Sequence, residues 1–422
     1  MRPPVRAALL AAGCTFVCVV ASAFGKPKPA DIVLQDGRVY TVNAKEPVVE
    51  AVAIRDGKII DVGTTEELKH WIAKATTVMQ LKGHPVYPGF KDSHAHLLRL
   101  GLSHLNGEYT GDPTPDVKRR AWSLAFVDCL RAGITAVDEA GLSYDDVELI
   151  KQIAAQGLIP IRLYVMLSGW PVLKRYEKPE IGLGEGHLTV RAVDLHADGP
   201  AGELRTATRY ALDHGFQVAT DAIDARSNRL VLDLYEHALS HDLSHGDLRW
   251  RIERAQVLDD ADIPRFAKLG VIASMQTVHA TSDRPWAADR IGIERVKESA
   301  YAWRKLLESG AIIANGTDAP VQSIDPIRNF YAAVTRMDEK GQPPGGFDPE
   351  ERMTREEALR SYTIEGAYAT FTERESGSIE VGKNADLVIL SQDIMRVPEA
   401  DILKVKAEYT IAGGRIYSLR AK

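Results

Sequence analysis

Cysteine is scarce in this chain, with three in 422 residues. Cys14 and Cys18 lie within the first two dozen residues, so Cys129 alone remains if that segment is removed. A chain with one cysteine cannot form an intrachain disulfide, and its stability must come from its apolar core and from any metal that it binds. Disulfide-stapled folds are therefore excluded.

A strong excess of one charge is also missing. The net charge of −6 is spread without long runs, which argues against nucleic acid or an anionic membrane surface as the main partner. The hydrophobic fraction of 45% and the charged fraction of 26% are ordinary for a soluble protein. A chain of this length can form more than one structural unit. We expect a small molecule as its partner, and the sequence leaves a homo-oligomer open.

Long apolar runs are absent except at the N-terminus. There, two arginines precede an apolar stretch over residues 7–24 that contains Ala21-Ser22-Ala23. This pattern is typical of a secretory signal peptide over residues 1–23, cleaved after Ala23. We therefore predict export to the periplasm or the cell exterior. A retained membrane anchor and a lipoprotein modified at Cys14 are the alternatives.

Both ends of the chain are rich in predicted strands. Asp36-Gly37 and Asp56-Gly57 each separate two apolar, alternating segments, and each predicts a hairpin. Similar segments return over 385–390 and 409–417. We expect residues 30–86 and 376–420 to form one small β-sandwich domain beside a larger domain over residues 87–375.

The middle of the chain alternates strands with helices. The strands are expected at Val86–Phe90, Gly133–Asp138, Ile159–Met166, Val190–Leu195, Gln217–Thr220, Leu248–Ile252, Val271–Met275 and Ile312–Ala314. The helices between them include Leu204–His214, Asn228–Leu239 and Ile263–Leu269, the first and last of which stop at Gly215 and Gly270. Thr354 and Glu357 form a capping box that opens a helix containing Leu359 and Ala367. Eight such alternations predict an α/β fold, a TIM-like (β/α)8 barrel whose active face lies at the carboxyl ends of the strands.

The most informative motif follows the first predicted strand. An apolar run leads into a Pro-Gly turn, which is followed by His94 and His96 with one residue between them. Side chains alternate along an extended strand, so both imidazoles are expected on the same side. Two such imidazoles can bind one borderline-soft divalent cation such as zinc. An exposed polar pair is the alternative for an isolated His-x-His.

Polar side chains also follow the later strands. They are Asp194 after the fourth, Asp221 after the fifth, Arg254 after the sixth, Gln276 and His279 after the seventh, and Asp318 after the eighth. The barrel would bring them to one face. Aspartate and histidine can ligate a cation, and an aspartate beside a metal-bound water can accept its proton. Each aspartate alone could instead cap a helix or form a turn. His237, His241 and His245, around a helix end, are interpreted as a solvated face.

Five stretches of the sequence carry a family resemblance. They are Pro88–Leu97, Arg251–Gln256, Asn315–Val321, Arg355–Ile364 and Gly377–Leu390. On these the chain resembles the amidohydrolase superfamily, in its YtcJ-like branch, also called amidohydrolase 3. The resemblance implies a metal-dependent barrel with a small β-domain and hydrolysis of carbon–nitrogen bonds other than peptide bonds. It also implies that Asp318 is ligand and general base and that His279 contacts the substrate. Gln276, at the end of the same predicted strand, is predicted as a second substrate contact.

Three positions depart from the family pattern. Asp194 stands where the family usually has a lysine, and Asp221 and Arg254 stand where it usually has histidines. An arginine has no lone pair to offer a metal. We expect Arg254 to pair with Asp221 and to close the second metal position. Family segments near 107–115 and 199–204 are also missing, which predicts a more open pocket.

What remains can hold one divalent cation, which we predict to be zinc. The ligands would be His94, His96 and Asp318, with Asp194 and Asp221 as replacement carboxylates. The first hypothesis is an exported amidohydrolase that cleaves an amide-type bond with a metal-activated water. The alternative is a catalytically impaired protein of the same fold that binds a ligand or a partner. A deaminase acting on a ring is a third reading, and the sequence does not specify the substrate.

Overall fold

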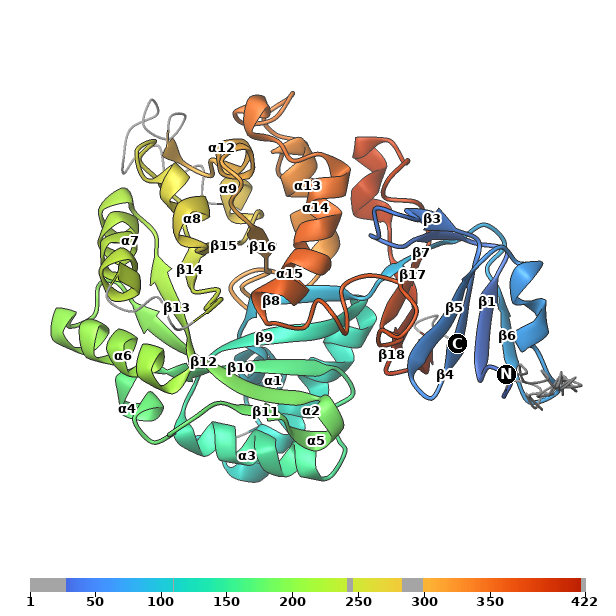
Figure 1. The fold of residues 1–422 in the computed structure, drawn as a ribbon, viewed down its shortest axis with the longest axis horizontal. Helices are drawn as coiled ribbons and strands as arrows, with labels where there is room; N and C mark the ends of the chain where they lie inside the picture. Colours follow the sequence, from blue (N-terminus) through green and yellow to red (C-terminus); the bar gives the residue numbers. More distant parts are fainter. Residues whose placement is uncertain (1–27, 109, 241–245, 283–298, 419–422) are drawn as a thin grey trace, which may run out of the picture.

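Eight parallel strands and the helices between them form a nearly closed barrel (Figure 1). The computed structural model describes residues 28–108, 110–240, 246–282 and 299–418. The predicted signal peptide, His241 and His245 therefore lie outside the described residues. Each barrel strand pairs in parallel with the next. In chain order they are β8 (Phe90–Ala95), β9 (Ile134–Leu142), β10 (Arg162–Ser168), β12 (Leu188–His196), β13 (Gln217–Ala222), β14 (Arg251–Arg254), β15 (Ile272–Met275) and β16 (Ile313–Asn315). The predicted TIM-like fold is confirmed.

The barrel closes at its C-terminal mouth through the segment that follows β16. The backbone N–H of Asp318 donates to the carbonyl of His94 at 2.8 Å, and the N–H of His96 donates to that of Ala319 at 2.7 Å. These bonds join the last strand to the first. A short strand, β11 (Glu180–Gly182), pairs antiparallel with β12.

Helices cover the outside of the barrel. They include α1 (Leu97–His104), α2 (Pro115–Arg131), α3 (Tyr144–Ala155), α4 (Gly169–Leu173), α6 (Ala201–His214), α7 (Ala225–Ser240), α8 (Ile263–Leu269), α12 (Trp303–Glu308), α13 (Pro326–Thr335), α14 (Arg355–Ser361) and α15 (Ile364–Ala369). Gly215 and Gly270 end α6 and α8 with φ of 76° and 65°, as predicted, because glycine adopts the left-handed conformation without strain. Among the described residues, no helix is long and apolar enough to cross a bilayer.

The helix predicted after the capping box is in fact two helices. Thr354 and Glu357 do form the reciprocal capping box of α14. The chain then leaves the helical conformation at Thr363 (φ −135°, ψ −96°), before α15 begins. A single helix running through Leu359 and Ala367 is therefore wrong.

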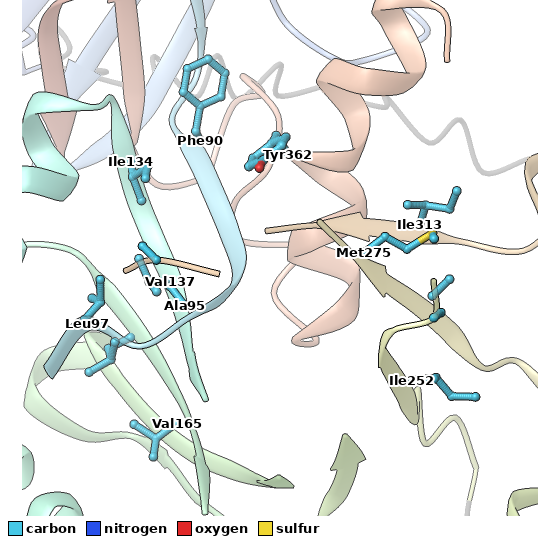
Figure 2. Packing of buried hydrophobic residues seen from close by; sticks show 14 of the residues in the cluster. Phe90, Ala95, Leu97, Ile134, Val137, Val165, Ile252, Met275, Ile313 and Tyr362 are labelled. Carbon is cyan, nitrogen blue, oxygen red and sulfur yellow. The ribbon is translucent and has the colours of Figure 1, made fainter. Parts of the chain in front are cut away.

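Apolar side chains on the outer face of the barrel strands pack against the surrounding helices. Figure 2 shows Val137, Val165, Ile252 and Ile313, from four strands, within the main buried cluster that packs strands against helices. A separate small cluster comprises Ala140, Tyr164, Met166, Ala192 and Ala219. Positions that alternate with the wall residues therefore face inward, and several of them carry charge.

Two sheets form the small β-domain, seen at the right of Figure 1. One has the order β5-β4-β1-β6, and the other has the order β19-β18-β17-β7-β2-β3. Their strands are β1 (Ile32–Gln35), β2 (Arg38–Tyr40), β3 (Val48–Val49), β4 (Ala51–Arg55), β5 (Lys58–Gly63), β6 (Thr77–Gln80), β7 (Pro85–Pro88), β17 (Leu387–Leu390), β18 (Ala407–Ala412) and β19 (Arg415–Ser418). One apolar cluster joins the two sheets into a sandwich built from both chain ends, with members such as Leu34, Val52, Val86 and Leu387.

Two strand predictions are wrong. Asp36-Gly37 does not turn a hairpin, because β1 and β2 belong to different sheets, whereas Asp56-Gly57 does connect the antiparallel pair β4 and β5. The run Val86–Phe90 is not the first barrel strand. Its first part lies in β7, which pairs with β2 and β17 of the small domain, and the barrel begins only at Phe90 in β8.

Candidate metal centre

Three potential metal ligands from distant parts of the chain meet at the barrel mouth. His94 is the penultimate residue of β8, His96 follows that strand, and Asp318 follows β16. Asp318 Oδ1 lies 3.7 Å from His94 Nε2 and 3.5 Å from His96 Nε2. One ligand atom from each residue lies within 4.8 Å of the others, and no second such group occurs in the described part of the chain. Both imidazoles thus lie on the same side, as strand alternation predicts.

Two atoms in this group are buried without a hydrogen-bond partner. His94 Nε2 and Asp318 Oδ1 form no hydrogen bond of acceptable geometry with any described residue. Such an atom costs on the order of 1–3 kcal/mol when it has no partner. A divalent cation would supply the missing contact. Two imidazole nitrogens and one carboxylate oxygen are a ligand set that suits zinc and leaves a coordination position open.

The far side of each imidazole is held by an acceptor. His94 Nδ1 lies 2.8 Å from Glu253 Oε2, and His96 Nδ1 lies 3.0 Å from the carbonyl oxygen of Ala140. An acceptor at Nδ1 keeps a proton there, so Nε2 is the nitrogen that faces Asp318 and that would ligate a metal in its deprotonated form. Both rings are therefore oriented for ligation.

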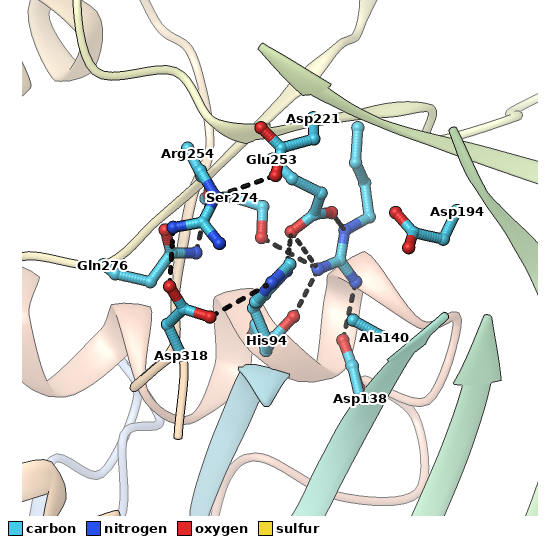
Figure 3. A network of polar contacts seen from close by, with 12 residues as sticks. His94, Asp138, Ala140, Asp194, Asp221, Glu253, Arg254, Ser274, Gln276 and Asp318 are labelled. Atoms are coloured by element: carbon cyan, nitrogen blue, oxygen red, sulfur yellow. Dashed lines mark hydrogen bonds and ion pairs between the residues drawn. The ribbon is translucent and has the colours of Figure 1, made fainter. Parts of the chain in front are cut away.

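Glu253 belongs to a buried chain of ion pairs across the barrel interior (Figure 3). Arg251 donates to Glu253 from Nε at 2.7 Å and to Asp138 from Nη1 at 2.6 Å. Lys91 pairs with the other oxygen of Asp138. None of these side chains is more than 7% exposed. We call Lys91, Asp138, Arg251 and Glu253 the interior ion-pair chain.

Sequence reasoning did not identify the interior ion-pair chain. A signal was available, because Arg251 and Glu253 flank the outward-facing Ile252 and must both point inward on a strand. Sequence alternation cannot tell, however, which strand supplies the opposite charges.

The ion pairs shift the pKa values of the central groups. Burial alone would raise the pKa of Glu253, but Arg251 and the bond with His94 outweigh it and hold this pKa at about 2. Burial would likewise lower the pKa of His94, yet Glu253 and Asp318 raise it to about 9. The pKa of Asp318 is lowered despite its burial, by the nearby imidazoles of His279 and His96 and by the charges of His94 and Arg254. In this arrangement Asp318 is ionised.

Arg254 stands at the position where the family resemblance predicts a second metal ligand. Its Nε donates to Asp221 at 2.7 Å, as predicted, and its Nη1 also donates to Asp318 Oδ2 at 2.6 Å, which was not predicted. Arg254 and Asp318 both have left-handed backbone, with φ of 71° and 58°, a strained conformation that clusters at functional sites. A guanidinium cannot ligate a cation, so these residues do not fit a second metal.

The other predicted site residues take different positions. His279 Nε2 lies 3.2 Å from Asp318 Oδ2, and the buried Gln276 donates from Nε2 to the carbonyl of Ser274 at 3.3 Å. Asp221 faces Arg254, and neither Asp221 nor Asp194 belongs to the group of three close ligand atoms. Neither caps a helix, since α6 follows Pro200 and α7 begins at Ala225. His237 is exposed on α7.

Known proteins resemble the chain in both sequence and fold. A sequence model described as Amidohydrolase family matches residues 111–417. YtcJ of Bacillus subtilis is 28% identical over 70% of this chain and 60% of its own length. The N-substituted formamide deformylase of Arthrobacter pascens is 25% identical over 68% of this chain, which spans 58% of that enzyme.

The fold has close structural counterparts as well. An uncharacterised metal-dependent hydrolase from Pyrococcus horikoshii superposes with a TM-score of 0.73 at 22% identity, over 87% of this chain and 99% of that protein. At this identity the likeness establishes the fold, while the match of the sequence model covers well over half of the chain. The chain belongs to the amidohydrolase family, as its motifs predict.

Proposed function

We propose that the protein is a hydrolase of non-peptide carbon–nitrogen bonds that uses a single divalent cation, zinc, held by His94, His96 and Asp318. The observation that carries this proposal is the convergence of their three ligand atoms within 4.8 Å, two of them buried and without partners among the described residues. The deformylase from Arthrobacter pascens, named for a substituted formamide, supports an amide-type substrate.

The protein's own groups would divide the proton transfers between them. A bound zinc ion supplies a water of lowered pKa, from 15.7 to about 7, and polarises the substrate carbonyl. Asp318 would accept the proton of the water as general base and return it to the leaving nitrogen as general acid. Arg254 and His279 both contact Oδ2 of this carboxylate, so they fix its orientation. His279 and Gln276 are the proposed contacts of the substrate.

Metal analysis tests the proposal directly. The full chain reconstituted with zinc should hold one ion per chain and hydrolyse N-formyl or N-acetyl amines. His96→Ala should lose both properties. His104→Ala is the matched control, because His104 ends the neighbouring helix and pairs with Asp128 at the surface. A protein that holds no zinc, manganese, nickel or iron after reconstitution would refute the proposal.

One observation favours the rival function, a catalytically impaired ligand-binding protein. Arg254 contributes a positive charge directly on the ligand Asp318, which weakens cation binding. The double variant Arg254→His with Asp194→Lys separates the two functions. Amide hydrolysis that appears only in the double variant would favour the ligand-binding function, whereas hydrolysis by the wild type would exclude it.

Export is proposed from the N-terminal sequence alone. The basic start, the apolar stretch and Ala21-Ser22-Ala23 support removal of residues 1–23. N-terminal sequencing of protein recovered from a secreting host should begin at Phe24. A retained Met1 would contradict the cleavage.

A further inference from the structure

A pocket opens at the barrel mouth beside the candidate metal centre. It encloses about 410 Å3, part of it open to solvent, between the ends of β10 and β12 and the starts of α4 and α6. The residues that line it include Gly169, Trp170, Asp194, His196, Pro200 and Glu203. Two of these are acidic, one is a tryptophan, and none is lysine or arginine.

Asp194 is the unusual member of this pocket. Its side chain is 9% exposed, and the nearest basic side chain among the described residues is His196, whose Nε2 lies 3.8 Å away and beyond hydrogen-bonding distance. No contact line reaches its carboxylate in Figure 3. No described residue is found donating a hydrogen bond to this carboxylate, and burial raises the pKa of Asp194 to about 6. A bound ligand could therefore supply the hydrogen-bond donor that the carboxylate of Asp194 lacks.

The position of Asp194 links the pocket to the metal centre. Asp194 Oδ2 lies against Gly141, where a Cβ atom would come within 2.7 Å of it. The preceding residue, Ala140, accepts the Nδ1 hydrogen bond of His96. A group bound by Asp194 would therefore lie beside the strand that orients a metal ligand.

We propose that Asp194 and Trp170 form a subsite for a positively charged nitrogen of the substrate, such as a primary ammonium. Asp194 supplies a charged acceptor, the ring of Trp170 offers a face that attracts cations, and Glu203 adds negative charge at the exposed side. This inference rests on the proposed function, because it concerns the substrate of the same site. It assigns Asp194 to the substrate and not to the metal.

Two probes of equal length test the subsite. N-acetyl-1,4-diaminobutane carries a terminal ammonium, and N-pentylacetamide replaces it with a methyl group. Calorimetry on the full chain, with and without zinc, should show the ammonium probe bound roughly 10- to 150-fold more tightly, since a hydrogen bond to a charged group has that strength. Asp194→Asn should remove the preference and leave the zinc content unchanged. Asp198→Asn, four residues further along in an exposed position outside the pocket, should keep both.

The outcomes separate this inference from the proposed function. Equal binding of the two probes, or binding of neither, would overturn the subsite, and so would loss of zinc from Asp194→Asn. An Asp194-dependent preference for the ammonium probe in a protein that hydrolyses nothing would sustain the subsite and refute the hydrolase.

Discussion

Replacing Glu253 by glutamine tests the physical reasoning behind the candidate metal centre. Glu253 is fully buried, accepts from Arg251 at 2.7 Å and contacts His94 Nδ1 at 2.8 Å. Glutamine keeps the shape but removes the charge, so Arg251 keeps only Asp138 as an anionic partner. Breaking a buried ion pair on one side costs about 3–5 kcal/mol. We therefore expect Glu253→Gln to lower the free energy of unfolding by about 3 kcal/mol.

The same change should weaken metal binding. A carboxylate behind a ligating imidazole orients the ring and raises its basicity, and losing such a partner typically costs 10- to 100-fold in affinity. The two effects are measured separately, by urea unfolding of the metal-free protein and by competition with a zinc chelator. Unfolding is monitored by tryptophan fluorescence, for which the chain has six residues.

A surface ion pair provides the control. Glu236 accepts from Arg265 at 2.8 Å and from Lys268 at 3.0 Å, but its side chain is 41% exposed, and solvent screens its charge. Glu236→Gln should change neither measurement. If Glu253→Gln loses no more stability than Glu236→Gln, the interior ion-pair chain does not support the fold. If it loses stability but keeps full zinc affinity, Glu253 does not orient His94 for metal binding.

Three further changes test the fold. In Gly101→Ala the new Cβ would lie 1.9 Å from the carbonyl oxygen of Ala121, so α1 and α2 must separate and the melting temperature should fall by the equivalent of about 1–3 kcal/mol. Gly202→Ala is the control, because open space surrounds Gly202 and the change should not destabilise the protein. Equal melting temperatures of the two variants would refute the close packing of α1 and α2. Burial raises the pKa of Glu139 from 4.5 to about 8. The contribution of protonated Glu139 to the free energy of unfolding is therefore fully present below pH 4.5 and is lost as the pH rises through 8. Glu139→Gln should flatten that slope in unfolding measured from pH 4 to 9, and an unchanged slope would contradict the burial argument. Thr354→Ala removes the capping box of α14 and should cost about 0.5–2 kcal/mol in urea unfolding, while Thr354→Ser should keep most of the cap; equal losses would exclude capping as the cause.

Local sequence patterns predicted most of the barrel because its elements follow local physics. Alternating apolar strands and glycine-terminated helices need no distant partner to be identified, and the ends of α6 and α8 follow from Gly215 and Gly270. The wrong predictions concern segments whose structure depends on which distant strand pairs with them. Asp36-Gly37 has hairpin residues, but the strands on either side find partners in different sheets. The run from Val86 is apolar enough for the barrel, yet β17 from the far end of the chain pairs with it.

The sequence by itself determined the fold class, the His94–His96 pair and the loss of the usual second-metal ligands at Asp221 and Arg254. The fold class and the histidine pair follow from residue type and spacing, and the loss of the second-metal ligands follows from comparison with the family pattern. Only the tertiary structure decided that Arg254 contacts Asp318 as well as Asp221, that Glu253 supports His94, and that Asp194 faces a pocket. The contacts of Arg254 with Asp318 and of Glu253 with His94 join residues 64 and 159 positions apart. The barrel curvature that brings them together is a property of the whole chain, and no local pattern encodes it.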